Sequence, residues 1–223
     1  MNPLQPSFDV IDRALRISHK YDVDRLFNWG LVHLHEYPKA DPRSPKYFLN
    51  KEWYKYTDPA FLVRLIQITQ LLDRRDLDGH AALAYYMLST IDWLLFNPKP
   101  VFRELDMDSL SRLTRGKSAI LSHSLGIIKG IREHRCTLGG GGLFATTKII
   151  EDNMVTCQAR KNATLDALVP RIGGDFVTAL SRCQTTRTCD PVASLITKGL
   201  TSVHGSILSD FGFLQHTLSQ PAL

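Results

Sequence analysis

Apolar side chains recur at helical spacing along most of this chain, and this periodicity limits the folds that it can adopt. The clearest case follows Asp22, where apolar residues occupy i, i+3, i+4, i+7, i+8 and i+11: Val23, Leu26, Phe27, Gly30, Leu31 and Leu34. This spacing places them on one face of a helix, and Asp22 is expected to cap it. No segment alternates apolar and polar residues as a strand series would. The sequence therefore predicts an all-α fold.

A second, shorter helix is expected immediately before this one. Ser7 stands where a capping residue is preferred, and Asp9 lies in the first turn, where the helix dipole favours a carboxylate. Its apolar residues form two adjacent stripes, one of Phe8, Ile11 and Leu15 and the other of Val10, Ala14 and Ile17. Two stripes predict burial on a wide face. Residues 1–38 are therefore expected to form a tight helix pair, with Tyr21 and Leu26 wedged at its turn.

Prolines and glycines divide the rest of the chain. Prolines at positions 38, 42 and 45 forbid a continuous helix, so residues 39–58 are expected to be a loop. Asp58 and Pro59 then form a cap-plus-proline start, and residues 59–135 are predicted to be a helical extension. Four glycines at 139–142 interrupt the pattern. Residues 136–223 are expected to be a helical or poorly ordered tail, with a new helix start at Asp190-Pro191.

Composition excludes several classes of protein. Hydrophobic residues make up 43% of the 223 residues, which is enough for a packed core and excludes wholesale disorder. The net charge is +5, but Lys and Arg are scattered, so a nucleic-acid partner is not expected. The basic and aromatic segment 46–56 could bind single strands, yet the same residues suit a loop that covers a helical body. No apolar run is long enough for a membrane span and no secretory leader is evident, so an intracellular protein (cytoplasm or nucleus) is expected.

One stretch resembles a catalytic motif. Ser122, Ser124 and Gly126 approximate the G-x-S-x-G nucleophile elbow of serine hydrolases, and Asp175 or Asp210 with His204 or His216 could complete a triad. Ser122 replaces the first glycine, however, and the preceding residues continue a helical pattern. Gly116-Lys117-Ser118 similarly matches only the end of a phosphate-binding loop, without its leading glycine or strand. We therefore expect a solvated helical turn there and no catalytic residue, with a small serine hydrolase as the alternative.

Metal and cofactor sites are not expected. His33 and His35 are two positions apart on a predicted helix, so their rings point to different faces. The cysteines are spaced irregularly for zinc, and reduced thiols are expected without a secretory leader. These four residues are Cys136, Cys157, Cys183 and Cys189. Buried small hydrophobes are the expected role for them, although a metal site at the last three remains open.

The first forty residues resemble a known family. Ser7 to Leu26, continuing into Leu31-Val32-His33-Leu34 and Tyr37-Pro38, look like the closing helices of a fungal, mushroom-type BTB/POZ domain. A looser likeness to the helical region after that domain includes Leu62 to Leu72, Ala84-Tyr85-Tyr86 and Leu110 to Lys117, and Cys157, Cys183 and Cys189 fall where many members carry cysteines.

The resemblance implies a non-enzymatic, adaptor-like protein that binds other proteins through grooves between its helices. It would comprise the C-terminal part of a BTB domain followed by a helical extension, with no cofactor. The sheet and earlier helices of that domain have no counterpart in this sequence. Because homodimerisation in the family relies on those parts, a homodimer is not expected.

Overall fold

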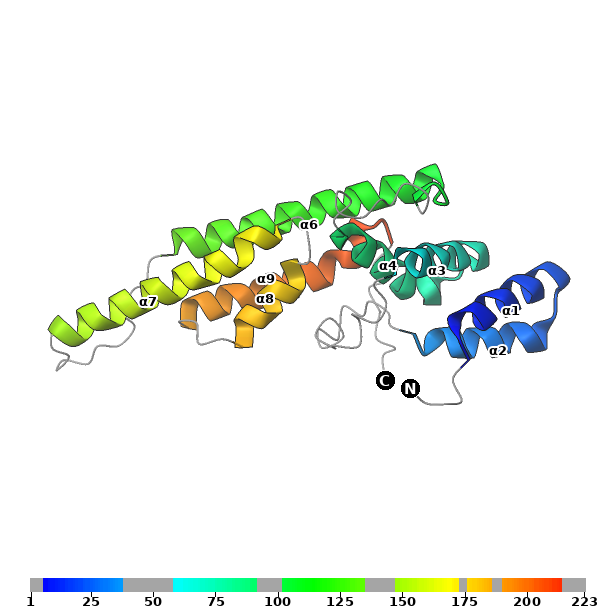
Figure 1. The fold of residues 1–223 in the computed structure, drawn as a ribbon, viewed down its shortest axis with the longest axis horizontal. Helices are drawn as coiled ribbons and strands as arrows, with labels where there is room; N and C mark the ends of the chain where they lie inside the picture. Colours follow the sequence, from blue (N-terminus) through cyan, green and yellow to red (C-terminus); the bar gives the residue numbers. More distant parts are fainter. Residues whose placement is uncertain are drawn as a thin grey trace, which may run out of the picture. The chain divides into compact units, whose positions relative to one another are not determined.

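The computed structural model describes residues 6–37, 58–91, 102–134, 147–172, 176–185 and 190–213. Of these residues 87% are helical, and none lies in a strand, which confirms the predicted all-α fold. The α-helices, drawn in Figure 1, are α1 (Phe8–Tyr21), α2 (Asp24–His35), α3 (Pro59–Leu72), α4 (Asp78–Thr90), α6 (Met107–Glu133), α7 (Thr147–Leu168), α8 (Phe176–Thr185) and α9 (Asp190–Asp210). Short 3₁₀ turns, η3 (Arg75–Leu77) and η4 (Val169–Arg171), complete the described elements. None of these helices has both the length and the apolar composition needed to cross a bilayer.

The chain forms two compact units. Unit 1 contains residues 1–116 and 206–223, and unit 2 contains residues 117–205. The boundaries between the units fall inside α6 and α9. The first part of α6 and the last part of α9 belong to unit 1, and the remainder of both helices belongs to unit 2.

In unit 1, α1 and α2 form the expected helix pair, but Asp22 has a different role from the one predicted. It ends α1 in the left-handed conformation, with φ 55° and ψ 48°, and its backbone N–H donates to the carbonyl of Ser18. Val23, not Asp22, precedes the first residue of α2. Asp tolerates left-handed φ better than most residues. An aspartate that ends one helix was therefore mistaken for the cap of the next.

The burial of α1 is narrower than its two apolar stripes predict. Phe8, Ile11 and Leu15 are buried as expected, whereas Val10 and Ile17 are 51% and 50% exposed. The other predicted contacts at the turn are weaker too: Tyr21 is exposed and Leu26 is half-buried. One stripe of α1 thus belongs to the core, and in the other Ala14 is buried as predicted while Val10 and Ile17 face outward.

Helices α3 and α4 form the second pair of unit 1, and α3 begins as predicted. Asp58 accepts a hydrogen bond from the backbone N–H of Ala60, and Pro59 is the first helical residue. An ion-pair cluster joins α3 to α1. Arg64 bonds to Asp12 through Nε and Nη2, at 3.2 and 2.7 Å, and also pairs with Asp9. Because the Asp12 side chain is only 5% exposed, these bonds supply the partners that a buried carboxylate requires.

In unit 2, α7 packs with α8, and the last part of α6 contacts α9 at Gly199 and α7 at Lys161. Lys161 on α7 is buried, with 8% of the residue exposed. Its Nζ donates to the carbonyls of Arg132 and His134 at 2.7 and 2.8 Å. These carbonyls lie at the end of α6, where the helix leaves its last acceptors unsatisfied. A lysine from a neighbouring helix thus caps α6, and the helix dipole favours its charge there.

Candidate functional site

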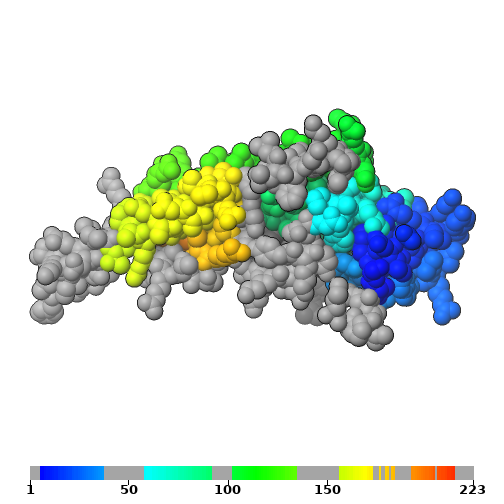
Figure 2. All heavy atoms as spheres, in the orientation of Figure 1, coloured from blue at the N-terminus to red at the C-terminus, as the bar shows by residue number. Residues whose placement is uncertain are grey.

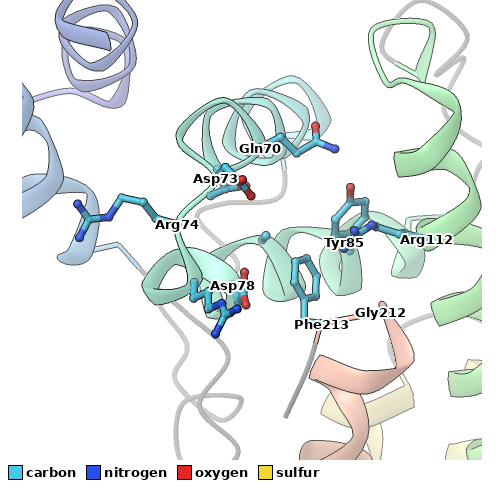
Figure 3. A pocket seen from close by; sticks show the side chains of 11 residues that line it. Gln70, Asp73, Arg74, Asp78, Tyr85, Arg112, Gly212 and Phe213 are labelled. Atoms are coloured by element: carbon cyan, nitrogen blue, oxygen red, sulfur yellow. The ribbon is translucent and has the colours of Figure 1, made fainter. Parts of the chain in front are cut away.

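A cavity of about 250 Å³ opens in unit 1 where α3 ends and α4 begins. Figure 3 shows it from close by, with α6 on one side and the residues that follow α9 on another. Its walls therefore come from α3 and α4, which follow one another in the sequence, and from two distant segments, α6 and the residues after α9. The lining residues are Thr69, Gln70, Asp73, Arg74, Arg75, Asp78, Ala81, Tyr85, Arg112, Gly212 and Phe213.

A buried hydrogen-bond network supports one wall of the cavity. The hydroxyl of Tyr85 and the amide of Gln70 both reach the Ser109 hydroxyl, at 2.9 and 2.8 Å. Ser109 in turn donates its backbone N–H to the carboxylate of Asp106, which precedes α6 as its cap, at 2.7 Å. Burial raises the pKa of Tyr85, so the phenol stays neutral, and hydrogen bonds from Ser109 lower the pKa of Asp106. This wall is consequently a fixed surface.

Arg112 supplies a positive charge at the same end. Its guanidinium carbon lies 5.1 Å from the centre of the Phe213 ring, a distance at which cation–π attraction operates. Phe213 also lies 6.1 Å from the Tyr85 ring, measured between centroids. Within the described part of the chain, no carboxylate lies within 4 Å of Arg112. The arginine thus lies over the Phe213 ring while its N–H edges keep their capacity to bind an anion.

The opposite end of the cavity carries carboxylates. Asp73 ends α3 with φ 43°, and Asp78 is the first residue of α4. In Figure 3 their side chains lie on the far side of Phe213 from Arg112. Arg74 points away from this space and bonds in a bidentate manner to Asp76, at 3.0 and 2.9 Å. That bond, reinforced by nearby His35, lowers the pKa of Asp76.

The cavity therefore has charges of both signs, separated by an aromatic surface. Its lining includes two carboxylates, Asp73 and Asp78, and three arginines, of which Arg74 and Arg75 directly follow Asp73 and Arg112 lies on the other side of Phe213. Among the described residues, no group of three or more His, Cys, Asp or Glu side chains is arranged to hold a metal ion. The arrangement suits binding of a polar organic group by ion pairing and aromatic contact.

A second candidate surface is the outward stripe of α1. Val10, Ile17 and Tyr21 are 51%, 50% and 65% exposed, and they occupy i, i+7 and i+11 of the helix. That spacing aligns the three side chains on one face. In Figure 2 the atoms of α1 and α2 are drawn in blue as a continuous part of the surface.

The residues of the elbow-like motif do not form a catalytic arrangement. Ser124 lies inside α6, is completely buried, and donates its hydroxyl to the carbonyl of Ile120 at 2.7 Å. It therefore occupies an ordinary helical position and not a strand-to-helix elbow. Asp210 accepts a hydrogen bond from Ser206. The other candidate partners, Asp175, His216 and the His204 side chain, lie outside what the structure describes.

Gly116 is buried within α6, where a Cβ would lie 2.0 Å from the Phe211 ring. The predicted solvated turn is wrong at this position: the glycine admits an aromatic ring from the other end of the chain. Ser118 is exposed, as expected for such a turn.

The predicted divergence of His33 and His35 is confirmed. His33 lies 3.4 Å from the Glu36 carboxylate, whereas His35 lies 3.3 Å from the carboxylate of Asp76. Cys183 is a buried thiol whose pKa burial raises, and Cys157 is half-buried. Cys136, Cys189 and the basic-aromatic segment 46–56 fall in parts of the chain that are not described.

Sequence reasoning missed the cavity. Its charged rim belongs to the run Asp73 to Gly79, which in sequence indicates no more than an acidic and basic turn. Nothing local connects that run with Arg112 or Phe213, since 37 or more residues separate them from Arg75. A search for charged turns would find the rim, but only the fold brings its partners together.

Comparison with known proteins does not assign the chain to a family. No protein-family model, no curated protein and no solved structure matches it significantly.

Proposed function

We propose that this chain is a non-enzymatic, adaptor-like protein that binds other proteins, of the BTB-containing type. The observation that carries the proposal is the outward stripe of α1, formed by Val10, Ile17 and Tyr21. Single exposed apolar residues are common on protein surfaces. Three that are aligned on one face and at least half exposed form a surface that can bind a partner.

The spacing of this stripe favours a helical partner. Ala14 falls between Val10 and Ile17 on the same face and is mostly buried, so the series runs i, i+4, i+7 and i+11. Alternating steps of four and three residues are the spacing by which helices pack side by side. The surface therefore suits the apolar face of an amphipathic helix.

Charges beside the stripe indicate what the partner carries. Arg13 and Lys20, seven residues apart, lie along its exposed edge, and Lys20 Nζ is 5.2 Å from the centre of the Tyr21 ring. Acidic residues flanking the partner's apolar face would complement these two cations. The resemblance of residues 7–38 to the closing helices of a BTB/POZ domain supports the same class of function, because such domains bind proteins.

The test is capture of partners by the full chain and by a stripe variant. Replacing Val10, Ile17 and Tyr21 together with serine should leave the melting temperature within a few degrees, because all three side chains are exposed. Proteins captured from lysate of cells that express the chain are quantified by mass spectrometry. The expected result is a set of proteins retained by the native chain and lost by the variant.

A matched control is Leu125→Ser, which removes an equally exposed apolar side chain (50%) from α6. It should retain the full set of partners. Charge reversal by Arg13→Glu and Lys20→Glu should reduce capture, most strongly at low salt. Equal capture by the native chain and the stripe variant would contradict the proposed function.

A further inference from the structure

We propose that Trp29 of α2 joins the outward stripe of α1 in a single partner-binding face, and that the partner is an acidic amphipathic helix lying along both helices. This inference rests on the proposed function and deepens it, because it adds a second helix to the binding surface. The four exposed side chains, called here the composite face, are Val10, Ile17, Tyr21 and Trp29.

The contact between α1 and α2 fixes the orientation of both helices. Phe8, at the start of α1, lies 5.6 Å from the Tyr37 ring that follows α2, measured between centroids, so the helices are antiparallel (Figure 1). In the middle of the pair Gly30 faces α1, because a Cβ there would lie 2.7 Å from Leu15. Rotation about each helix axis can therefore be counted from Leu15 on α1 and from Gly30 on α2.

One side of this helix pair is covered by the rest of unit 1. On α1, Asp12 bonds to Arg64 of α3. On α2, His35 lies 3.3 Å from the carboxylate of Asp76, which belongs to η3. At about 100° per residue, Asp12 and His35 are both reached by turning in the same sense from the contact between the helices. That sense of rotation leads to α3 and η3.

The composite face lies on the opposite side of the pair. The stripe residues are reached by turning about 120–160° from Leu15 in the other sense, and Trp29 by turning about 100° from Gly30 in that sense. In an antiparallel pair, equal senses of rotation lead to the same side of both helices. Ile17 and Trp29 also lie within about 1.5 Å of the same level, since they follow the central contact by two residues and by one toward the connecting turn.

Trp29 is suited to anchor a partner. It is 37% exposed, and its indole makes an edge-to-face contact with the His33 ring, with centroids 4.8 Å apart and planes at 66°. This contact orders the indole before binding, so little conformational freedom is lost when a partner arrives. Trp and Tyr are enriched among the residues that dominate the energy of protein interfaces, and the composite face presents one of each.

Cations border the composite face on both helices. Arg13 and Lys20 flank it on α1, and Arg25 flanks it on α2, one turn before the tryptophan; all three are exposed. None of them makes an ion pair with a described residue. Glu36 places one carboxylate at the far end of α2. The excess of positive charge favours acidic residues beside the apolar positions of the partner.

A helix fits this face better than an extended peptide. From Val10 to Tyr21, α1 rises about 16 Å, or roughly three turns, so a partner helix of similar length covers the stripe. A third helix can pack its ridges against those of α1 and α2 together. Backbone pairing with an extended peptide requires a strand edge, and the residues that the structure describes contain no strand.

The experiment measures binding of a synthetic helix to the full chain. The probe is a fluorescein-labelled peptide of about three heptads with Leu at positions a and d and Glu at e and g, and a matched peptide carries Lys at e and g. Repulsion between like charges keeps each peptide from pairing with itself. Fluorescence anisotropy at low salt follows the titration. The expected result is saturable binding of the acidic peptide, at least ten-fold tighter than that of the basic peptide.

Variants test the contribution of α2. Trp29→Ala should weaken the acidic peptide at least ten-fold. Val32→Ala is the matched control, since Val32 is 61% exposed on the same helix but lies about 200° from Gly30 and so faces away from α1; its affinity should stay within two-fold.

A charge variant keeps the test decisive if Trp29→Ala lowers the melting temperature. Arg25→Glu alters only an exposed side chain, and it should weaken the acidic peptide at least three-fold. Arg160→Glu reverses an exposed arginine of α7 in unit 2, and it should leave the affinity within two-fold.

The outcomes separate this inference from the proposed function. Loss of the acidic peptide by the stripe variant, with unchanged affinity in Trp29→Ala and Arg25→Glu, would place the partner on α1 alone and overturn the inference while the proposed function stands. Unchanged affinity in the stripe variant would also overturn it, and the capture experiment tests the proposed function independently. Absence of saturable binding of the acidic peptide, or binding of the chain to phosphatidylserine vesicles in its place, would overturn the inference as well.

Discussion

The two parts of α6 are packed by different means, although they belong to one continuous helix. In unit 1 the helix begins with the Asp106 cap and the Ser109 network, and it then closes on the Phe211 ring at Gly116. In unit 2 the same helix contacts Gly199 of α9 through Ile127, and Lys161 caps its end. One part relies on rigid aromatic and polar contacts, and the other on flexible aliphatic contacts with a cation at the terminus.

This difference teaches which contacts can adapt. A Cβ added at Gly116 would lie 2.0–2.5 Å from three atoms of a completely buried ring, whereas at Gly199 it would meet the flexible end of Ile127 at 2.7 Å. Both distances require movement, but only an aliphatic side chain can change rotamer without displacing a core aromatic. Substitutions at these contacts test that contrast.

Gly116→Ala is expected to destabilise the protein most. The gain in helix propensity, about 1 kcal/mol, is smaller than the cost of overpacking against Phe211, about 3 kcal/mol. A net loss of about 2 kcal/mol should lower the melting temperature by roughly 4–8 °C for a chain of this length. Differential scanning calorimetry measures it. Adding Phe211→Leu should restore part of the loss, and the double-mutant cycle would report the coupling. A melting temperature at or above that of the native chain would show that Phe211 does not lie on this glycine.

Lys161→Met tests the cap in unit 2. Methionine keeps most of the apolar stem but removes the charge, so the carbonyls of Arg132 and His134 lose their donor. Hydrogen bonds to charged groups contribute about 1.5–3 kcal/mol, and we expect a loss at the lower end of this range, about 1.5 kcal/mol, in the free energy of unfolding. Chemical denaturation measures this change.

Lys129→Met is the matched control for the cap. Lys129 is highly exposed and pairs with Glu133 at 3.9 Å on the surface of the same helix. The expected effect is below about 0.5 kcal/mol. Equal losses for the two lysines would mean that the contacts of Lys161 do not cap α6.

The contrast between these contacts also explains what the sequence could predict. The start of α3 was predicted correctly because Asp58 and Pro59 act on backbone groups within three residues. Asp22 was misassigned because aspartate is common at both positions: it caps helix starts, and it also tolerates the left-handed conformation that ends a helix. Gly116 could not be interpreted locally, since its partner, Phe211, lies 95 residues later. Burial was predicted wrongly for Val10 and Ile17, because periodicity does not tell which of two apolar faces the rest of the chain covers.

The response to acid should also differ between the two units. Among the described residues, the carboxyl groups with displaced pKa values all lie in unit 1: Asp9, Asp76 and Asp106. Hydrogen bonds to the charged form lower the pKa of each of them. A lowered folded-state pKa contributes stability above the unfolded value near 4, and that stability is lost as pH falls through the folded-state value. The melting temperature should therefore fall as pH drops from about 5 to 2.

Asp106→Asn isolates one part of this dependence. Asparagine keeps an acceptor at the cap but does not titrate, so the variant should lose less stability than the native chain between about pH 5 and 3. Asp108→Asn is the control, since Asp108 lies in the same turn and does not accept the hydrogen bond from Ser109. Thermal melts followed by circular dichroism provide the comparison, and an identical pH dependence in all three proteins would be inconsistent with a titrating cap.

The smallest expected effects come from glycines in the second part of α6 and its neighbour. At Gly126 an added Cβ meets nothing within 4 Å, so Gly126→Ala should stabilise the protein by about 0.5–1 kcal/mol through helix propensity alone. Gly199→Ala should be close to neutral, because the same gain is offset by a rotamer change at Ile127. The changes in the free energy of unfolding for Gly116→Ala, Gly199→Ala and Gly126→Ala then rank how easily each site accommodates an added methyl group. If Gly199→Ala destabilises as strongly as Gly116→Ala, the aliphatic contacts of unit 2 are as rigid as the aromatic contacts of unit 1, and the contrast between the two parts of α6 does not hold.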